Sequence, residues 1–166
     1  QYGDLPLGYD HKYVYSHFGY NLKATDMQAA IGCAQIKKFP TFVEKRIHNF
    51  DRLKAALAGC EDKLILPEAC DNARPSWFGF LITCKEGVDR NKVVPYIEAR
   101  MLFAGNLIKH PCFDQMRASG KGYRVIGDLS VTDRVMNNTF WVGVYPGMTD
   151  EMIDYMAKTI KEAVNQ

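Results

Sequence analysis

Two β-rich runs stand among several helical patterns, and their small number constrains the fold most. The runs are 77–84 (WFGFLITC) and 139–145 (TFWVGVY). Each is rich in aromatic and β-branched residues and is followed by a glycine-bearing turn, which is typical of strands. We expect the first strand to be buried on both faces. Two strands are too few for a doubly wound sheet, so the sequence predicts an α+β fold, a small antiparallel or mixed sheet covered by helices.

The first half of the chain carries two capping boxes on either side of a proline. Thr25 is followed by Gln28 three residues later, which predicts a helix over about 26–38. Pro40 is expected to stop this helix, and Thr41 with Glu44 predicts the start of a second, long one. Gly59 offers a C-terminal stop. The sequence therefore predicts a sharply bent helix pair, with an inward face in the second helix formed by Val43, Ile47, Phe50 and Leu57.

Further capping residues mark the starts of helices in the second half of the chain. Asp89 predicts a helix to about Arg100, bent or shifted by Pro95, with Val93, Ile97 and Met101 inward. Residues 102–127, rich in glycine and polar groups, are expected to form a long functional loop. Asp128 would cap a short helix to about Asn137. Thr149 would cap a terminal helix with an inward face formed by Ile153, Met156, Ile160 and Ala163.

Composition excludes several classes of function. The 166 residues carry a net charge of +2, which gives no support to a nucleic-acid partner. No apolar run approaches the roughly 20 residues of a membrane span, and no secretory signal precedes the first motif, so we expect a cytoplasmic protein. The cysteines are never closer than ten residues apart, a spacing that does not favour a metal site within the chain. They are Cys33, Cys60, Cys70, Cys84 and Cys112.

One segment has the composition of a binding loop. Residues 13–23 are aromatic, polar and glycine-bearing, and they lie just ahead of the capped helix at Thr25. Exposed amides at such a helix start favour an anion such as phosphate. Composition alone favours an ordinary loop with tyrosines packed on the core. A Cys112–His110 dyad is also conceivable, although residues two apart in a loop seldom form one.

Several motifs resemble those of one enzyme family. The run 19–32 (GYNLKATDMQAAIG) is similar to a hallmark of the DegT/DnrJ/EryC1/StrS sugar aminotransferases, which are fold-type I pyridoxal-phosphate enzymes. Lys23 and Ala24 replace the usual arginine and methionine, and this departure resembles the CDP-6-deoxy-hexulose 3-dehydrase branch. The resemblance extends over essentially the whole chain through segments 8–13, 77–80, 103–107, 127–129 and 137–147.

The resemblance implies a larger enzyme. Residues 1–40 would belong with its cofactor domain and 41–166 would form its small C-terminal domain, of a chain more than twice as long. The catalytic lysine, a histidine in the dehydrases, and the cysteines of a [2Fe–2S] cluster would lie upstream, and the segment alone would be inactive. Pyridoxamine or pyridoxal phosphate, a nucleotide-sugar substrate, a homodimer and a reductase partner are implied. A sugar aminotransferase and a non-catalytic α+β interaction module remain the alternatives.

The resemblance also implies roles for individual residues. Asn21 matches the asparagine that reaches the cofactor phosphate of the neighbouring subunit, and the same loop offers further cofactor contacts in Tyr20, Phe18 and His17. The substrate contacts would come from Asn106, Lys109, His110 and Trp77. For Trp77, core packing is at least as good an interpretation. For Lys109, a solvated surface lysine is an equal alternative to a diphosphate contact.

Overall fold

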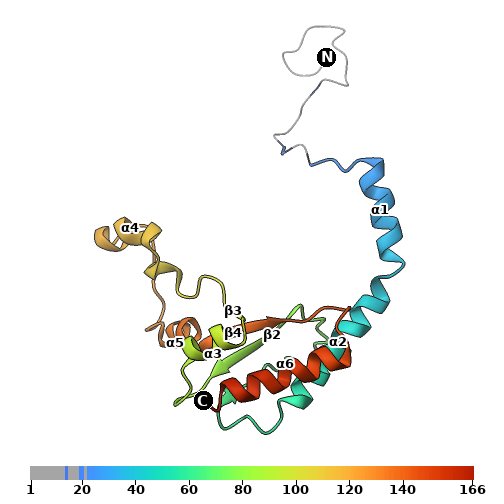
Figure 1. Ribbon diagram of the computed structural model, residues 1–166. Helices are drawn as coiled ribbons and strands as arrows, with labels where there is room; N and C mark the ends of the chain where they lie inside the picture. The colour runs from blue at the N-terminus through green and yellow to red at the C-terminus, as the bar shows by residue number, and fades with distance from the viewer. Residues whose placement is uncertain (1–13, 15–18, 21) are drawn as a thin grey trace. The chain divides into compact units, whose positions relative to one another are not determined.

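The computed structural model, drawn in Figure 1, describes residues 14, 19–20 and 22–166. The chain divides into two units, which are described separately. The first unit comprises residues 1–38 and the second 39–166. Within the described residues, no helix combines the length and the apolar content that a membrane crossing requires.

The described part of the first unit is built on one helix, α1 (Asp26–Ile36). The Thr25 hydroxyl accepts from the Gln28 amide at 3.3 Å, and the Gln28 side chain accepts from the Thr25 amide at 2.9 Å. This confirms the first capping box, although the helix ends two residues earlier than expected. No residue of α1 is buried, and Met27 is 78% exposed. Local capping rather than a packed face therefore defines this helix.

The second unit begins with the long helix α2 (Phe39–Ala56). The expected capping box at Thr41 is wrong, because Pro40 already lies in the first turn and Thr41 lies inside the helix. A proline is tolerated there, since its missing N–H would have had no intrahelical partner. The helix buries Phe50, Leu53 and the following Leu57, whereas Val43 and Ile47 are half-buried.

The sheet contains four strands rather than the expected two. They are β1 (Leu64–Ile65), β2 (Gly79–Cys84), β3 (Arg100–Met101) and β4 (Thr139–Gly143), in the spatial order β1-β2-β4-β3. Every pairing is antiparallel, with Phe80 opposite Val142 and Ile82 opposite Phe140. The α+β class is confirmed.

The two faces of β2 differ in burial. Phe80, Ile82 and Cys84 are essentially inaccessible, whereas Leu81 is 40% exposed. The expectation of a strand buried on both faces is therefore wrong. Strand β2 alternates between two faces, as is common in antiparallel sheets with one face on the core.

The helix after β2 is shorter than the sequence suggested. Helix α3 (Arg90–Tyr96) begins as expected, with the Asp89 carboxylate accepting from the Asn91 amide at 2.9 Å. Pro95 lies in its last turn, and the chain then enters β3. Met101 therefore lies in an edge strand, half exposed, and not on an inward helical face.

The two C-terminal helices lie close to their expected positions. The expected cap of helix α5 (Ser130–Asn138) at Asp128 is wrong, because Leu129 occupies the N-cap position; the Asp128 carboxylate still accepts from the Ser130 amide at 2.9 Å. Helix α6 (Asp150–Ala163) is capped by the Thr149 hydroxyl, which accepts from the Met152 amide at 3.3 Å. The buried residues of α6 are Ile153, Ala157, Ile160 and Ala163. Met156 packs against this core from a half-buried position.

The segment expected to be one long loop is partly helical. It contains the 3₁₀ turns η2 (Leu107–Lys109) and η3 (Pro111–Phe113) and the short helix α4 (Asp114–Ser119). Gly120, at φ +64°, ends α4 in the left-handed conformation that glycine adopts readily. A single core joins α2, β1, β2, α3, β4 and α6.

Candidate functional site

The expected cofactor loop is only partly described. His17, Phe18 and Asn21 lie outside the described residues. Tyr20 is described, and its side chain is 92% exposed. Its ring is therefore accessible to a group supplied by another part of the protein.

The start of α1 offers limited room for an anion. The capping box occupies the Thr25 and Gln28 amides, while the amides of Asp26 and Met27 have no intrahelical acceptor. The Asp26 carboxylate lies in the same turn and would oppose a phosphate there. The described residues thus fit only the edge of a cofactor-phosphate site, namely two amides and the Tyr20 ring.

A polar cluster in the second unit joins two of the expected substrate residues. The Asp133 carboxylate, on α5, accepts from the Asn106 side-chain amide at 2.8 Å. The same oxygen lies 2.7 Å from the Lys109 ammonium nitrogen. Asn106 is 3% exposed, whereas the Lys109 side chain is 52% exposed. Asp133 therefore fixes a buried amide and a more exposed cation side by side.

The backbone beside this cluster is closely fitted to α5. Gly105 adopts φ +59°, and a Cβ atom on it would lie 2.5 Å from the Met136 Cγ atom. The backbone N–H of Asn106 points to the Met136 sulfur, with the nitrogen 3.4 Å from it. Only glycine combines the left-handed backbone with this close approach. The Gly105–Asn106 peptide thus sets where the polar cluster lies.

His110 is engaged within the same segment. Its Nε2 atom contacts the Ala104 carbonyl oxygen. Arg117 donates to the Ile108 carbonyl, to the His110 carbonyl at 3.3 Å, and to the Asp114 carboxylate. These bonds fold residues 104–117 onto themselves, so the segment presents its side chains from a fixed backbone.

Trp77 lies apart from that segment and packs on α2. Its ring stacks on Phe50 with centroids 5.9 Å apart and an interplanar angle of 25°. The residue is 37% exposed, so part of its side chain remains accessible. This contact supports the packing interpretation of Trp77 that the sequence left open.

Hydrogen bonding stabilises the ionised form of the Asp133 carboxyl. Hydrogen bonds from Lys109 and then from Asn106 lower the pKa of the Asp133 carboxyl below its usual value. The Lys109 ammonium has three donors, and its exposure leaves room for a second acceptor such as a phosphate oxygen. Asp133 thus holds the lysine in place and neutralises part of its charge, while the exposed donors of Lys109 remain accessible.

Sequence reasoning missed Asp133 and Arg117. Asp133 lies inside a helix whose pattern is otherwise unremarkable, 27 positions after the amide it binds. Arg117 acts on backbone carbonyls, which leave no mark in a sequence. No spacing rule could have identified Asp133, whereas the i,i+3 spacing of Asp114 and Arg117 was a signal that could have pointed to Arg117.

The thiols are not arranged as ligands in the described part of the chain. Cys33, Cys70 and Cys112 are exposed, whereas Cys60 and Cys84 are buried. Burial raises the pKa of the Cys84 thiol to about 11. Residues 14, 19–20 and 22–166 hold no group of three or more His, Cys, Asp or Glu side chains placed for a metal ion. These residues do not fit an iron–sulfur cluster.

Comparison with known proteins identifies the family. The sequence profile of the DegT/DnrJ/EryC1/StrS aminotransferase family matches residues 5–161. The chain belongs to this family. The chain is similar to the "Lipopolysaccharide biosynthesis protein RfbH" of Salmonella typhimurium, which is 52% identical over 98% of this chain. The "dTDP-4-dehydro-2,6-dideoxy-D-glucose 3-dehydratase" of Saccharopolyspora spinosa is 47% identical, also over 98% of the chain.

Solved structures share the fold. The E. coli "GDP-4-keto-6-deoxy-D-mannose-3-dehydratase with bound hydrated PLP" matches 90% of this chain with a TM-score of 0.75 at 24% identity, and the match covers 38% of that structure. An aminotransferase from Psychrobacter cryohalolentis matches 98% with a TM-score of 0.77 at 19% identity, and the match covers 45% of that structure. The chain thus shares its fold with part of each of these structures.

The chain spans only part of its relatives. It covers 38% of the length of the Salmonella protein and 35% of the Saccharopolyspora protein.

Proposed function

We propose that this chain is the C-terminal segment of a nucleotide-sugar 3-dehydratase that uses pyridoxamine or pyridoxal phosphate. The whole enzyme would remove the C3 hydroxyl of a CDP-4-keto-6-deoxyhexose during surface-polysaccharide biosynthesis. One observation carries this proposal: two relatives, one named for lipopolysaccharide biosynthesis and one for 3-dehydration, are 52% and 47% identical over 98% of the chain. The CDP preference is supported by Lys23 and Ala24 in the family hallmark.

The cofactor, when bound, supplies the electron sink that lets the C3–oxygen bond break. The chain's own part is to hold it. Asn21 would bind the phosphate across a homodimer interface, and Tyr20, with Phe18 and His17, would line the pocket. The exposed Tyr20 ring and the open amides at the start of α1 are consistent with an edge contact to a partner-bound cofactor.

The polar cluster of Asn106, Lys109 and Asp133 would bind the sugar nucleotide. Lys109 would donate to a diphosphate oxygen as a point charge, while Asp133 restrains its side chain at 2.7 Å. Asn106, buried and bonded to Asp133, would act by positioning the segment. His110 would present its ring from the fixed turn beside them, and the accessible part of Trp77 would border the sugar.

The remaining parts of the proposal concern the whole enzyme. It would be a cytoplasmic homodimer whose [2Fe–2S] cluster is held by cysteines outside the present sequence. A reductase partner would deliver electrons through that cluster to complete deoxygenation. The buried thiols Cys60 and Cys84 would take no part, because burial raises the pKa of both.

The alternative is a sugar aminotransferase, because the fold is shared with aminotransferases such as the Psychrobacter enzyme. One residue of the whole protein separates the two functions: lysine at the cofactor-linking position means aminotransferase, and histidine means dehydratase. Reading this residue in the complete gene tests the proposal. A lysine there would overturn the dehydratase.

A second experiment addresses the nucleotide. The purified whole enzyme, loaded with pyridoxamine phosphate, is offered CDP-, GDP- and dTDP-linked 4-keto-6-deoxyhexoses at equal concentration. The proposal expects the CDP sugar to be consumed fastest. Preferential use of either other nucleotide would refute the CDP assignment and leave the reaction type standing.

The Asn21 assignment has its own test. Asn21→Ala in the whole enzyme should weaken cofactor retention, measured as cofactor absorbance after dialysis. The control Asn91→Ala removes an exposed asparagine whose backbone amide, not its side chain, bonds Asp89. Equal retention in the two variants would refute the assignment.

A further inference from the structure

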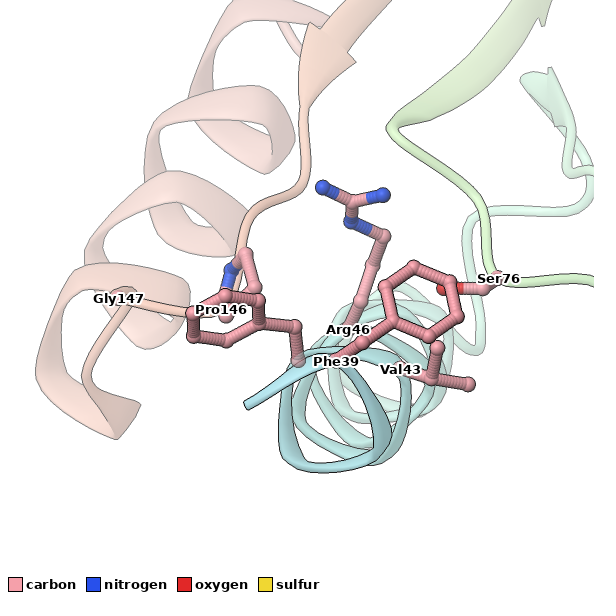
Figure 2. Close-up of a pocket in the computed structure, with 7 residues that line it drawn as sticks. Phe39, Val43, Arg46, Ser76, Pro146 and Gly147 are labelled. Atoms are coloured by element: carbon pink, nitrogen blue, oxygen red, sulfur yellow. The ribbon is translucent and has the colours of Figure 1, made fainter. Parts of the chain in front are cut away.

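A pocket of about 530 Å³ opens beside the first turns of α2 (Figure 2). Its apolar walls come from Phe39, Phe42 and Val43 of the helix and from Pro146 after β4. Ser76 and Gly147 complete the lining. None of these residues was singled out as a binding residue from the sequence.

Arg46 places a cation in this pocket. Figure 2 shows its side chain extending from α2 between the segment of Ser76 and the segment of Pro146. Its Nε atom is buried and has no hydrogen-bond partner within the described residues. Arg46 as a whole is half-buried, and the cost of leaving its buried Nε–H without an acceptor favours an added acceptor at this site.

The acidic residues near Arg46 form ion pairs with other arginines. Glu44, two residues before Arg46, accepts two bonds from Arg74 at 2.9 and 3.1 Å. Arg52, on the same helix, is paired with Asp154 at 2.9 Å and with Asp150 at 3.5 Å. Arg46 has no acidic partner among residues 14, 19–20 and 22–166. Both arginines have a buried Nε atom without a partner, but only Arg52 is neutralised by carboxylates among the described residues.

The walls of the pocket are held in place by the next turn of the same helix. Asn49, 4% exposed, donates to the Tyr145 carbonyl oxygen at 2.8 Å and so anchors the Pro146–Gly147 turn. Phe50 stacks on Trp77 and anchors the segment that carries Ser76. The sides of the pocket at Ser76 and at Pro146–Gly147 are therefore held in place, whereas Phe39 and Phe42 line it as exposed side chains of α2.

We infer that this pocket binds a small carboxylic acid with an apolar body. The guanidinium would bind the carboxylate, Ser76 would add a donor, and the phenylalanine side chains would cover the apolar part. A single cation balances one negative charge, and the mainly apolar lining gives no second cation for a phosphate dianion. The ligand is thus a monoanionic acid of about the size of phenylacetate.

The test is an amide chemical-shift titration of the 166-residue chain with phenylacetate. We expect saturable shifts of the Ser76 and Gly147 amides with millimolar affinity. Phenylacetamide, which has the same shape without the charge, should bind about tenfold more weakly, as should phenylacetate to Arg46→Gln. The control Arg134→Gln removes an exposed arginine of α5 and should leave the affinity unchanged.

Three results would overturn the inference. They are shifts that do not saturate, equal affinity for acid and amide, and unchanged affinity in Arg46→Gln. If the Arg46→Gln variant failed to fold, as a loss of dispersion in its amide spectrum would show, the inference would be tested by comparing phenylacetate with phenylacetamide on the unaltered chain. Binding of a capped Phe-Asp dipeptide without binding of phenylacetate would also overturn it, because the occupant would then be a polypeptide side chain.

Discussion

The two faces of the sheet differ sharply in how they are covered. On one face, Phe80, Ile82 and Phe140 are fully buried in a core shared with α2, α3 and α6. On the other, Leu81 lies opposite Trp141 at 40% exposure. The first face is covered by packed side chains, whereas the second is an exposed aromatic surface, called the open face below.

The aromatic side chains of the open face pack on one another around Trp141. The Trp141 ring lies so close over Gly79 that an added Cβ would approach its Cε3 atom to 2.6 Å. Phe78 and Phe103 contact the same ring, at centroid distances of 5.5 and 6.0 Å, although both are more than half exposed. Such a patch is typical of a surface that another polypeptide covers. It fits a chain that spans 38% of a relative's length.

The largest expected effect is a difference in the free energy of unfolding between substitutions at two neighbouring residues of β2. Ile82→Ala removes a fully buried side chain and should lower the free energy of unfolding by about 2–5 kcal/mol. Leu81→Ala, on the open face, should cost less than about 1 kcal/mol. Urea denaturation followed by circular dichroism measures both. Equal losses would show that the two faces are equivalent in stability.

The next effect concerns the peptide that positions the polar cluster. Gly105→Ala combines a left-handed backbone with a clash against Met136 and should destabilise the chain by about 2–4 kcal/mol. Gly120→Ala is the matched control: it has φ +64° but nothing within 4 Å of the added Cβ, and should cost about 1–2 kcal/mol. Urea denaturation compares them. If Gly120→Ala were the more damaging, the close fit to α5 would be refuted.

A smaller effect is expected on self-association through the open face. Phe103→Ser removes a 74% exposed aromatic side chain beside Trp141, and it should weaken self-association about tenfold, or about 1.4 kcal/mol. Tyr155→Ser, at 71% exposure on α6, is the matched control and should have no such effect. Sedimentation velocity over a concentration series measures this. A chain that stays monomeric at every concentration would count against the prediction.

The smallest effect is a titration at Asp133. Its pKa is lowered, so the bonds from Lys109 and Asn106 are fully present above the ordinary aspartate pKa of about 3.9 and are lost as the pH falls through the lowered value. The Asn106 side-chain amide resonance should report this loss. In Asp133→Asn the step should vanish. A step that persists in the variant would mean that another group titrates there.

Local signals in the sequence predicted the helix starts well. The caps at Thr25, Asp89 and Thr149 hold because each depends on a side chain and an amide two or three residues away. The box at Thr41 failed because Pro40 is equally acceptable inside the first turn. Strands β1 and β3 were missed because two residues carry no periodicity, and only their partners define them.

The candidate site was less accessible to sequence reasoning. The resemblance pointed to Asn106 and Lys109, but the carboxylate that joins them comes from α5, far along the chain. The pocket at Arg46 depends on turns after β4 and before β2 that meet only in the folded chain. Long-range contacts of this kind leave no spacing pattern.

The function is tested most directly by the fate of the sugar's C3 oxygen. The whole enzyme, with pyridoxamine phosphate and a reductant, is incubated with a CDP-4-keto-6-deoxyhexose, and the product is examined by mass spectrometry and NMR. The proposed dehydratase predicts a sugar that has lost its C3 hydroxyl and carries no nitrogen. A product that keeps the C3 hydroxyl and gains an amino group at C4 would contradict it.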